Sequence, residues 1–555
     1  MDRTVMIKKF TPLLGFLSIF APSVASGQPT DVPLRLTVDG AVRLALENNL
    51  DLAADRLDPQ IGDLRVSTAN GAFRPNFNTN LNRNNQLQPP TSFLIPTSTR
   101  NDVVTSNVGI GQRLPFLGTT YNIGWNSTHT VSNSFLSSYN PLLQSGLSLN
   151  LTQPLFKDLT IDGPRSQLAL QHGNRAMADT RLRESIVHTT AGTKTAYWNL
   201  VNAIANVDAR RSALLLAEEL VRVNKAKVDV GQSPPLDLVS AEAEVASNRE
   251  QLIVAETAVR QAEDRLRMLI FDPTKQDAWK VKLEAVDSPR IEPFALDLDG
   301  AVANALRSRA DLERSRQEID NAKITEKLAG NQRLPDIRVN ATYQASGLGG
   351  TQINRDYSGG FPGIILGPGA VTPFGSVLNQ LLSSNYPTWV FGVSVSYPIG
   401  QSTEEATYAR SRLETVQAQQ RAKSAQARVI QQVRDAGWKV DMNIKRLDTT
   451  RAGRELAEQR LDAEQKRFEV GISTSFLVIQ AQRDLAQART NELAAILSYD
   501  LSLVDFESLQ QAGPAGTAAA PPTAAQTLQA FPAVTATTAR PAGTGTTSLI
   551  PGGVF

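Results

Sequence analysis

The 555-residue chain has no cysteine and only three histidines: His129, His172 and His188. The missing cysteine excludes disulfides, thiolate metal sites and cysteine nucleophiles, and so few histidines leave little for metal or acid–base chemistry. No glycine-rich phosphate cradle and no catalytic triad is recognisable. The composition therefore disfavours an enzyme, and we expect no catalytic residue, no cofactor and no metal site.

An excess of one charge sign is also missing, because 56 Lys and Arg face 54 Asp and Glu, for a net charge of +2. Proteins that bind nucleic acid usually carry a basic excess on one face, so we expect no nucleic-acid partner. The sequence has no run of roughly 20 apolar residues, the length that a membrane-spanning helix needs. Any membrane function must therefore use another architecture.

Residues 1–27 have the pattern of a cleaved signal peptide. Basic residues precede an apolar run from Phe10 to Phe20, and small residues follow it. A short membrane anchor is the weaker alternative, since the run is too short to cross roughly 30 Å of hydrocarbon. We predict export with cleavage near Gln28, and no lipid anchor at the new N-terminus, because no cysteine follows the signal.

The rest of the chain contains an internal duplication. Residues 36–46 match residues 296–306, and later Trp198 falls on Trp438 at the same offset that places Val230-Gly231 on Val470-Gly471. Internal repeats of this kind mark structural units. We predict a first repeat at 28–271 and a second at 296–511.

Each repeat opens with a segment that predicts one helix. The mixed apolar and charged pattern runs from Val38 to Ser67 in the first repeat, with Thr37 or Asp39 as the N-cap, and from Leu298 to Lys327 in the second. A proline follows each of these segments.

Charge-poor segments with a period of two come next, at about 74–155 and about 335–400. Alternation such as that in Leu147–Thr152 and Val390–Tyr397 predicts strands with one apolar face. A soluble two-faced sheet is the ordinary explanation, but the signal peptide and the scarcity of charge favour strands of a closed membrane barrel.

Three details of these strands are predicted as well. We expect residues 347–387 to form a long external loop, because they are rich in Gly, Pro and Ser. An extra strand from Tyr121 to Thr128 is predicted to pair with residues 108–112, and whether it joins the barrel stays open. Five aromatic residues are expected at strand ends, at the membrane interface: Tyr121, Trp125, Tyr386, Trp389 and Tyr397.

Each repeat closes with a long helical hairpin, at about 164–271 and about 402–511. At 1.5 Å per residue, the first helix of each would be a rod about 100 Å long. Apolar residues recur at coiled-coil spacing, although Arg454 takes the place that Leu214 has in the first repeat. The chain turns at Gly231–Pro235 and at Gly471–Ser475.

Two segments lie outside the repeats. Residues 272–295, which include Trp279, are predicted to be an equatorial connector that packs as a belt around the helices. Residues 512–555 are rich in Ala, Thr, Pro and Gly, so we predict a disordered tail whose function stays open.

The tandem repeats, the order of helix, strands and hairpin, and the tip sequences at residues 227–231 and 467–471 together resemble the TolC-like outer-membrane efflux protein family. The resemblance covers roughly Leu36 to Gln510. It implies a mixed α and β fold, in which a homotrimer shares one outer-membrane β-barrel that continues as a long periplasmic α-helical barrel. Each copy would supply four strands and four helical columns.

The resemblance also implies function, partners and location. Such a channel-tunnel lies in outer-membrane lipid with a periplasmic extension, and it exports substrates in tripartite efflux or type I secretion. It receives them from a periplasmic adaptor (membrane fusion) protein and from an inner-membrane transporter, whose class the sequence leaves unknown. The adaptor would dock on the tip residues Val230, Gly231, Val470 and Gly471, although each glycine also fits a simple helix end.

The resemblance further implies a periplasmic gate between the tip helices, with Asp237 as the acidic member of a polar link. Asp237 also fits a simple helix N-terminal carboxylate. The sequence departs from the family at the partners of that link, where Phe468 replaces a tyrosine and Ser473 an arginine. Leu477 and Gln480 stand where some members have a cation-binding pair of aspartates. We therefore hypothesise a hydrophobic constriction made by Phe476 and Leu477.

Two rival functions come from other classes. A periplasmic coiled-coil scaffold or adaptor without a pore would explain the hairpins, but it leaves the charge-poor strands without a reason. A hydrolase is the weaker rival, because its candidate carboxylates are predicted to be solvated on charged helix faces: Asp51, Asp55, Asp58, Glu242 and Glu244.

Overall fold

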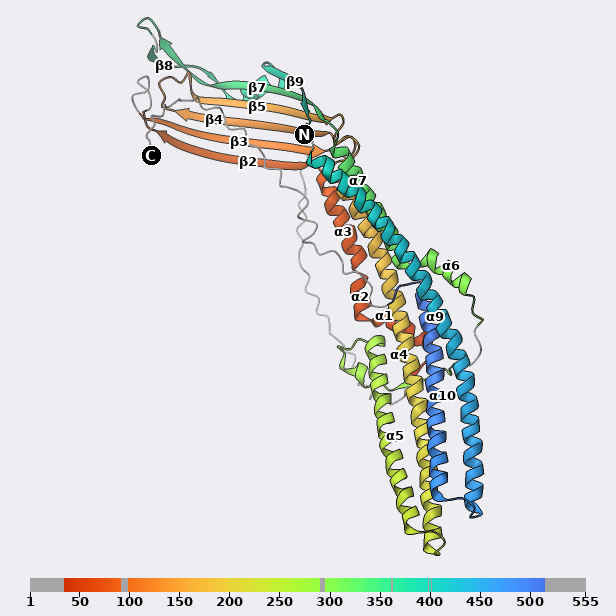
Figure 1. Cartoon of the computed structure of the whole chain (residues 1–555). Helices are drawn as coiled ribbons and strands as arrows, with labels where there is room; N and C mark the ends of the chain where they lie inside the picture. Colours follow the sequence, from red (N-terminus) through yellow and green to blue (C-terminus); the bar gives the residue numbers. More distant parts are fainter. Residues whose placement is uncertain are drawn as a thin grey trace, which may run out of the picture.

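The computed structural model describes residues 34–90, 98–289, 295–360, 363–397, 399–400 and 402–514. A curled sheet forms one end of the molecule, and a bundle of long helices extends away from it (Figure 1). The predicted signal peptide and all but the first residues of the predicted tail lie outside the described part. Within that part, no helix has the length and hydrophobicity needed to cross a membrane.

The two helices predicted at the start of the repeats are each interrupted, so the prediction of single helices is wrong. Asn49 has extended backbone, and its side chain accepts a hydrogen bond from the N–H of Leu52 at 2.9 Å, which starts a new helix. Arg309 is also extended and interrupts the second copy. The resulting elements are α1 (Val38–Asn48), α2 (Leu50–Asp55), α3 (Asp58–Asn70), the short 3-10 helix η1 (Gly71–Phe73), α6 (Leu298–Ser308) and α7 (Ala310–Gln332).

The first helix begins at the predicted cap. The Thr37 hydroxyl accepts a hydrogen bond from the N–H of Gly40 at 3.1 Å. This bond satisfies one of the free donors of the first helical turn. Of the two predicted caps, the structure therefore selects Thr37 and leaves Asp39 inside the helix.

The sheet contains seven antiparallel strands: β2 (Asn76–Gln88), β3 (Thr99–Arg113), β4 (Thr120–Ser132), β5 (Tyr139–Pro154), β7 (Asp336–Asp356), β8 (Ile364–Thr372) and β9 (Pro387–Ser396). They are ordered β2-β3-β4-β5-β7, after which β8 and β9 both pair with β7. The extra strand predicted at 121–128 is β4, and it lies between β3 and β5. The sheet of one copy therefore contains more strands than the four that the resemblance implied for its share of a barrel.

The external loop predicted at 347–387 is largely ordered secondary structure, which corrects that prediction. It contains the end of β7, all of β8 and the short helix α8 (Phe374–Leu382). The α8 side chain of Gln380 accepts from the N–H of Leu348 at 3.0 Å and donates to its carbonyl at 3.2 Å. These bonds satisfy β7 backbone groups between the stretches that pair with β9 and β8.

The two faces of the sheet differ in polarity. In-register residues form an apolar row across six strands: Phe77, Ile110, Ile123, Leu149, Tyr343 and Trp389. One residue further along each strand, the opposite face carries a polar row: Asn78, Gly109, Gly124, Ser148, Gln344 and Thr388. Trp125 lies in the middle of β4, opposite Val108 and Leu147, so its predicted place at a strand end is wrong.

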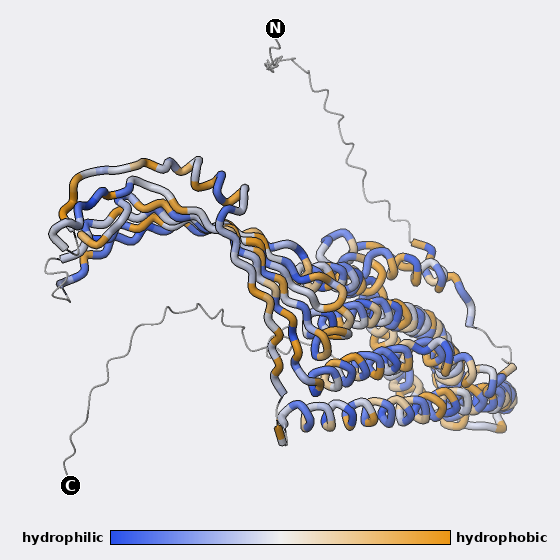
Figure 2. The backbone as a smooth tube through the Cα atoms, turned by 90° about the horizontal axis from the view of Figure 1, so that it is seen from above, coloured by the Kyte–Doolittle hydropathy of each residue, from blue (hydrophilic) through white to orange (hydrophobic). Residues whose placement is uncertain are grey.

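Four helices make the long part of the molecule: α4 (Gly163–Asp229), α5 (Pro235–Ile270), α9 (Thr403–Glu469) and α10 (Ser475–Leu509). They carry hydrophilic and hydrophobic residues mixed along their length (Figure 2). In the half near the sheet, α4 and α9 pack against α3 and α7, and in the far half they pack against α5 and α10 (Figure 1). Arg454 departs from the apolar ladder because it pairs with Glu492 of α10 at 2.6 Å.

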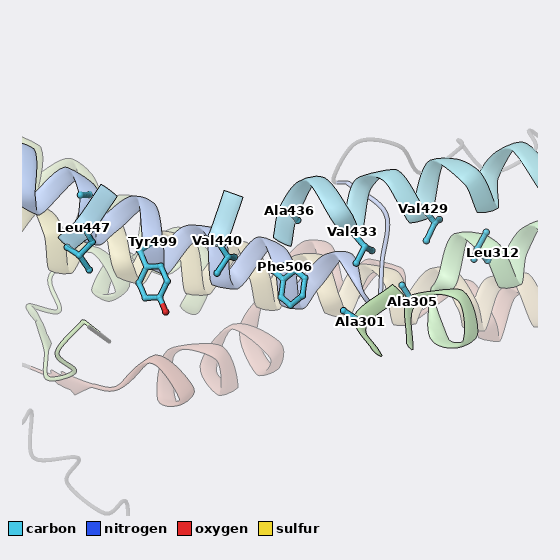
Figure 3. Close-up of a cluster of buried hydrophobic side chains, with 11 residues drawn as sticks. Ala301, Ala305, Leu312, Val429, Val433, Ala436, Val440, Leu447, Tyr499 and Phe506 are labelled. Atoms are coloured by element: carbon cyan, nitrogen blue, oxygen red, sulfur yellow. The ribbon is translucent and has the colours of Figure 1, made fainter. Parts of the chain in front are cut away.

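The main apolar core lies where the two kinds of packing meet. Small residues of α6 and the side chain of Leu312 in α7 contact α9 and α10, whose buried residues include Tyr499 and Phe506 (Figure 3). The predicted connector contributes to a second apolar core, in which Leu283 packs with Leu36 and Tyr197; the short strand β6 (Leu283–Ala285) pairs there in parallel with β1 (Leu34–Leu36). Its other described element is the 3-10 helix η2 (Gln276–Trp279), and residues 290–294 lie outside the described part.

A buried ion pair joins α4 to α7. The guanidinium of Arg314 donates to the carboxylate of Glu184 at 2.9 Å, and His188 lies 3.9 Å from the same carboxylate. Glu184 is 2% exposed. Burial raises the pKa of Glu184, but His188 and Arg314 outweigh it and hold that pKa below its ordinary value of 4.5.

This pair predicts a pH dependence of stability. A carboxylate with a depressed folded-state pKa stabilises the fold above its ordinary pKa, and that stabilisation is lost as the pH falls through the depressed value. The wild type should therefore lose more thermal stability than Glu184→Gln when the pH is lowered from neutral to below 4.5. Unfolding midpoints of both proteins at the two pH values measure this, and equal losses would contradict it.

Candidate functional site at the helical tips

The two hairpin turns lie at the end of the molecule furthest from the sheet (Figure 1). Gly231 and Gly471 have φ of +75° and +76°, a left-handed conformation that residues other than glycine rarely adopt. In both turns the N–H after the glycine donates to the carbonyl five residues earlier at 2.8 Å, from Gln232 to Lys227 and from Ile472 to Arg467. These are Schellman caps, so both glycines are needed by the backbone.

The tips also carry exposed apolar side chains. Val230 and Val470 are 68% and 69% exposed, and Ile472 beside them is 79% exposed. Apart from each glycine and its two chain neighbours, no described atom lies within 4 Å of where a Cβ on Gly231 or Gly471 would stand, so both turns present an open surface. Both turns are therefore held by glycine and exposed at their apolar side chains.

Phe468 is part of the apolar core between the two hairpins. It is 6% exposed and packs in a cluster with Leu461 and Val478. The ammonium of Lys227 in α4 donates to the Phe468 carbonyl at 2.8 Å and lies 3.5 Å from the centre of its ring. Phe468 thus makes a cation–π contact with α4 within one chain.

A polar contact accompanies it. The buried side-chain amide of Asn224 donates to the Ser475 hydroxyl of the other hairpin at 2.7 Å and to the backbone carbonyl of Asp237 at 3.2 Å. The Asp237 carboxylate is half-buried, and among the described residues it has no hydrogen-bond or ion-pair partner.

The remaining predicted gate residues lie on the second hairpin. The hydroxyl of Ser473 donates to Glu464, and the amide of Gln480 donates to Asp484 at 2.9 Å. Phe476 and Leu477 are 69% and 44% exposed at the start of α10. Both are exposed within one chain, and the hydrophobic constriction stays a prediction.

An ion pair also joins the two hairpins, and sequence reasoning did not predict it. Arg483 of α10 donates to Glu244 of α5 at 2.7 Å, and Glu244 is 6% exposed, so the prediction of a solvated Glu244 is wrong. The Glu244 carboxylate raises the pKa of Arg483 above its ordinary value. Both residues line a cleft of about 220 Å³ between the hairpins, with Gln482 and Arg210. No motif signals this pair, because it joins residues far apart in sequence.

Comparisons with known proteins agree with this architecture. The structure superimposes on the outer-membrane channel CmeC of Campylobacter jejuni with a TM-score of 0.60, at 16% identity over 85% of each chain. For CusC the TM-score is 0.62, at 13% identity over 87% of this chain and 93% of CusC. For the open state of the MtrE outer-membrane channel of Neisseria gonorrhoeae it is 0.57, at 17% identity over 86% and 89%. At such identities the likeness establishes the fold.

The sequence itself identifies the family. No curated protein matches the chain. Residues 111–270 and 301–509, more than half of the chain, match the profile of the outer membrane efflux proteins. The protein is therefore a member of the outer membrane efflux protein family.

Proposed function

We propose that three copies of this chain assemble into an outer-membrane channel-tunnel that exports substrates delivered by a periplasmic adaptor and an inner-membrane transporter. The observation that carries the proposal is a two-faced sheet continuous with helices about 100 Å long. The apolar face suits lipid and the polar face suits water, while the helices have the length to extend the passage through the periplasm. The family membership supports the same function.

The proposed division of the chain follows from this function. Residues 28–271 and 296–511 form two tandem units, each with barrel strands and a tunnel hairpin, and 272–295 connect them at the equator. Val504 of the second unit packs in one apolar core with Leu36 and Tyr197 of the first unit, which supports treating the two units as one rigid wall.

The adaptor is proposed to dock on the tips, at Val230, Gly231, Val470 and Gly471. Replacing the exposed Val470 with aspartate should weaken adaptor binding about tenfold, because burying one valine contributes roughly 1.5 kcal/mol. Site-specific crosslinking from Ile472 in cells that contain the native adaptor measures the effect.

Leu456→Asp is the matched control, since it places the same charge at an exposed apolar position of α9 that lies 14 residues before Val470, outside the tip. It should retain most of the crosslinking. Equal crosslinking in the Val470→Asp variant and the wild type would exclude this valine from the docking surface.

The rival function, a periplasmic scaffold without a pore, is opposed by the exposed apolar face of the sheet. On β9 alone, Trp389, Phe391 and Val393 are each more than half exposed, and such a face would be costly in water. Membrane fractionation distinguishes the two functions. Recovery of the folded protein in the soluble periplasmic fraction would contradict the channel.

A further inference from the structure

Six strands of one chain lie side by side and share a single row of in-register residues. The apolar row that starts at Phe77 of β2 continues without a break to Trp389 of β9. The seventh strand, β8, pairs only with the far part of β7, from Gly350 onward. It therefore lengthens the sheet beyond that row and adds no strand to its width.

The two outer edges of this sheet have few of the features that protect free edges. Isolated edge strands are usually short, charged, bulged or interrupted by proline. β2 has 13 residues with Arg83 as its one charge, and β9 has its proline at the first position, Pro387. Both pair with their inner neighbours in unbroken register, and within the described chain nothing pairs with their outer edges. Such edges suit pairing with another strand.

Strand direction identifies the partner as a second copy of this chain. β2 leaves the helical end of the sheet after α3, and β9 returns to that end before α9 (Figure 1). The β9 edge of one copy can therefore pair antiparallel with the β2 edge of the next. Because the number of crossing strands per copy is even, every neighbouring pair in a closed ring is antiparallel, as outer-membrane barrels require.

We propose that three copies close an eighteen-stranded barrel, six strands from each, through β9-to-β2 pairing; this rests on the trimeric channel proposed above. At about 4.8 Å between strands and a tilt of about 40°, eighteen strands give a backbone diameter of roughly 36 Å, against roughly 24 Å for twelve. A ring of twelve helices at about 9 Å spacing has a diameter of roughly 34 Å. The wider barrel therefore meets the helical tunnel without a narrowing at the junction.

The lumen of this barrel would be polar and almost uncharged. Asparagine, glycine, serine, glutamine and threonine make up the polar row that faces it. Where all six strands pair, charged side chains on this face are confined to the helical end, at Arg113, Asp336 and Arg338. The barrel would admit bulky hydrated cargo and select little by charge.

Single cysteines test the proposal, because the chain has none of its own. The hairpin β3–β4 decides the strand number. In an eighteen-stranded barrel, Asn107→Cys and Asn122→Cys would face the lumen. Their neighbours Val108→Cys and Ile123→Cys would face lipid. In outer membranes, a charged thiol reagent should label the first pair at least about tenfold faster than the second. The matched control on β5 is Asn150→Cys against Leu149→Cys.

The outcomes separate this proposal from the channel itself. Equal labelling of both faces of β3 and β4, with alternation kept on β5, would place the hairpin outside the barrel and overturn the eighteen strands while the channel stands. Loss of alternation on β5 as well would contradict both. Electron cryomicroscopy of the full-length protein in nanodiscs counts the strands directly: eighteen supports the proposal, and twelve overturns it.

Discussion

Replacement of Arg314 by leucine is expected to destabilise the protein by about 3–5 kcal/mol, because it leaves a buried carboxylate without its main partner. The side chains of Arg314 and Glu184 are 9% and 3% exposed, and the pair holds α7 against α4. His188 lies 3.9 Å away and compensates only in part. The midpoint of thermal unfolding of the assembled protein measures the loss.

A double variant gives the control for this prediction. Glu184→Met combined with Arg314→Leu removes both charges and fills a similar volume, so most of the lost stability should return. Arg222→Ala breaks the exposed pair with Glu219 and should leave the midpoint unchanged. A single Arg314→Leu variant as stable as the wild type would show that the pair contributes nothing to the fold.

Replacement of Glu244 by glutamine is expected to open the periplasmic end of the channel. The Glu244–Arg483 pair joins α5 of the first hairpin to α10 of the second, at 2.7 Å. Since Arg483 is more than half exposed, screening limits the pair to about 1 kcal/mol per copy. Three links that break together then shift the open-to-closed ratio by roughly a hundredfold. Single-channel recording in planar bilayers measures the open fraction.

The matched control is Glu218→Gln. Glu218 pairs with Arg249 at 2.9 Å, but both residues belong to the first hairpin. Loss of this pair changes the charge of the tip region by the same amount without releasing one hairpin from the other. An equal rise in conductance for both variants would show that charge, and not the link between hairpins, controls the opening.

Much of the fold could be predicted from the sequence because its signals are local. The long helices follow from proline-free segments with a heptad spacing, and α4 and α9 begin and end within about two residues of the predicted bounds. The tip turns follow from a glycine that ends each helix, which the positive φ of Gly231 and Gly471 explains. The period of two in the strands predicted an apolar and a polar face.

Other features depend on contacts between distant residues and could not be predicted. The interruption between α6 and α7 at Arg309 depends on the buried guanidinium of that residue. It donates hydrogen bonds to the carbonyl of Leu509 and to the side chain of Gln432. The secondary structure described within 347–387 depends on Gln380, which satisfies the β7 backbone at Leu348. A composition rich in glycine and proline suggests a loop when those partners are unknown.

The sequence by itself determined the class of the protein: two tandem units, strands with two unlike faces, long helices and glycine turns, because periodicity and turn chemistry act over a few residues. Only the tertiary structure decided how these elements combine. It placed β4 between β3 and β5, paired Glu244 with Arg483 and buried Phe468 between the hairpins. The physical reason is that register, burial and ion pairing depend on which distant segments meet, and no local pattern encodes that choice.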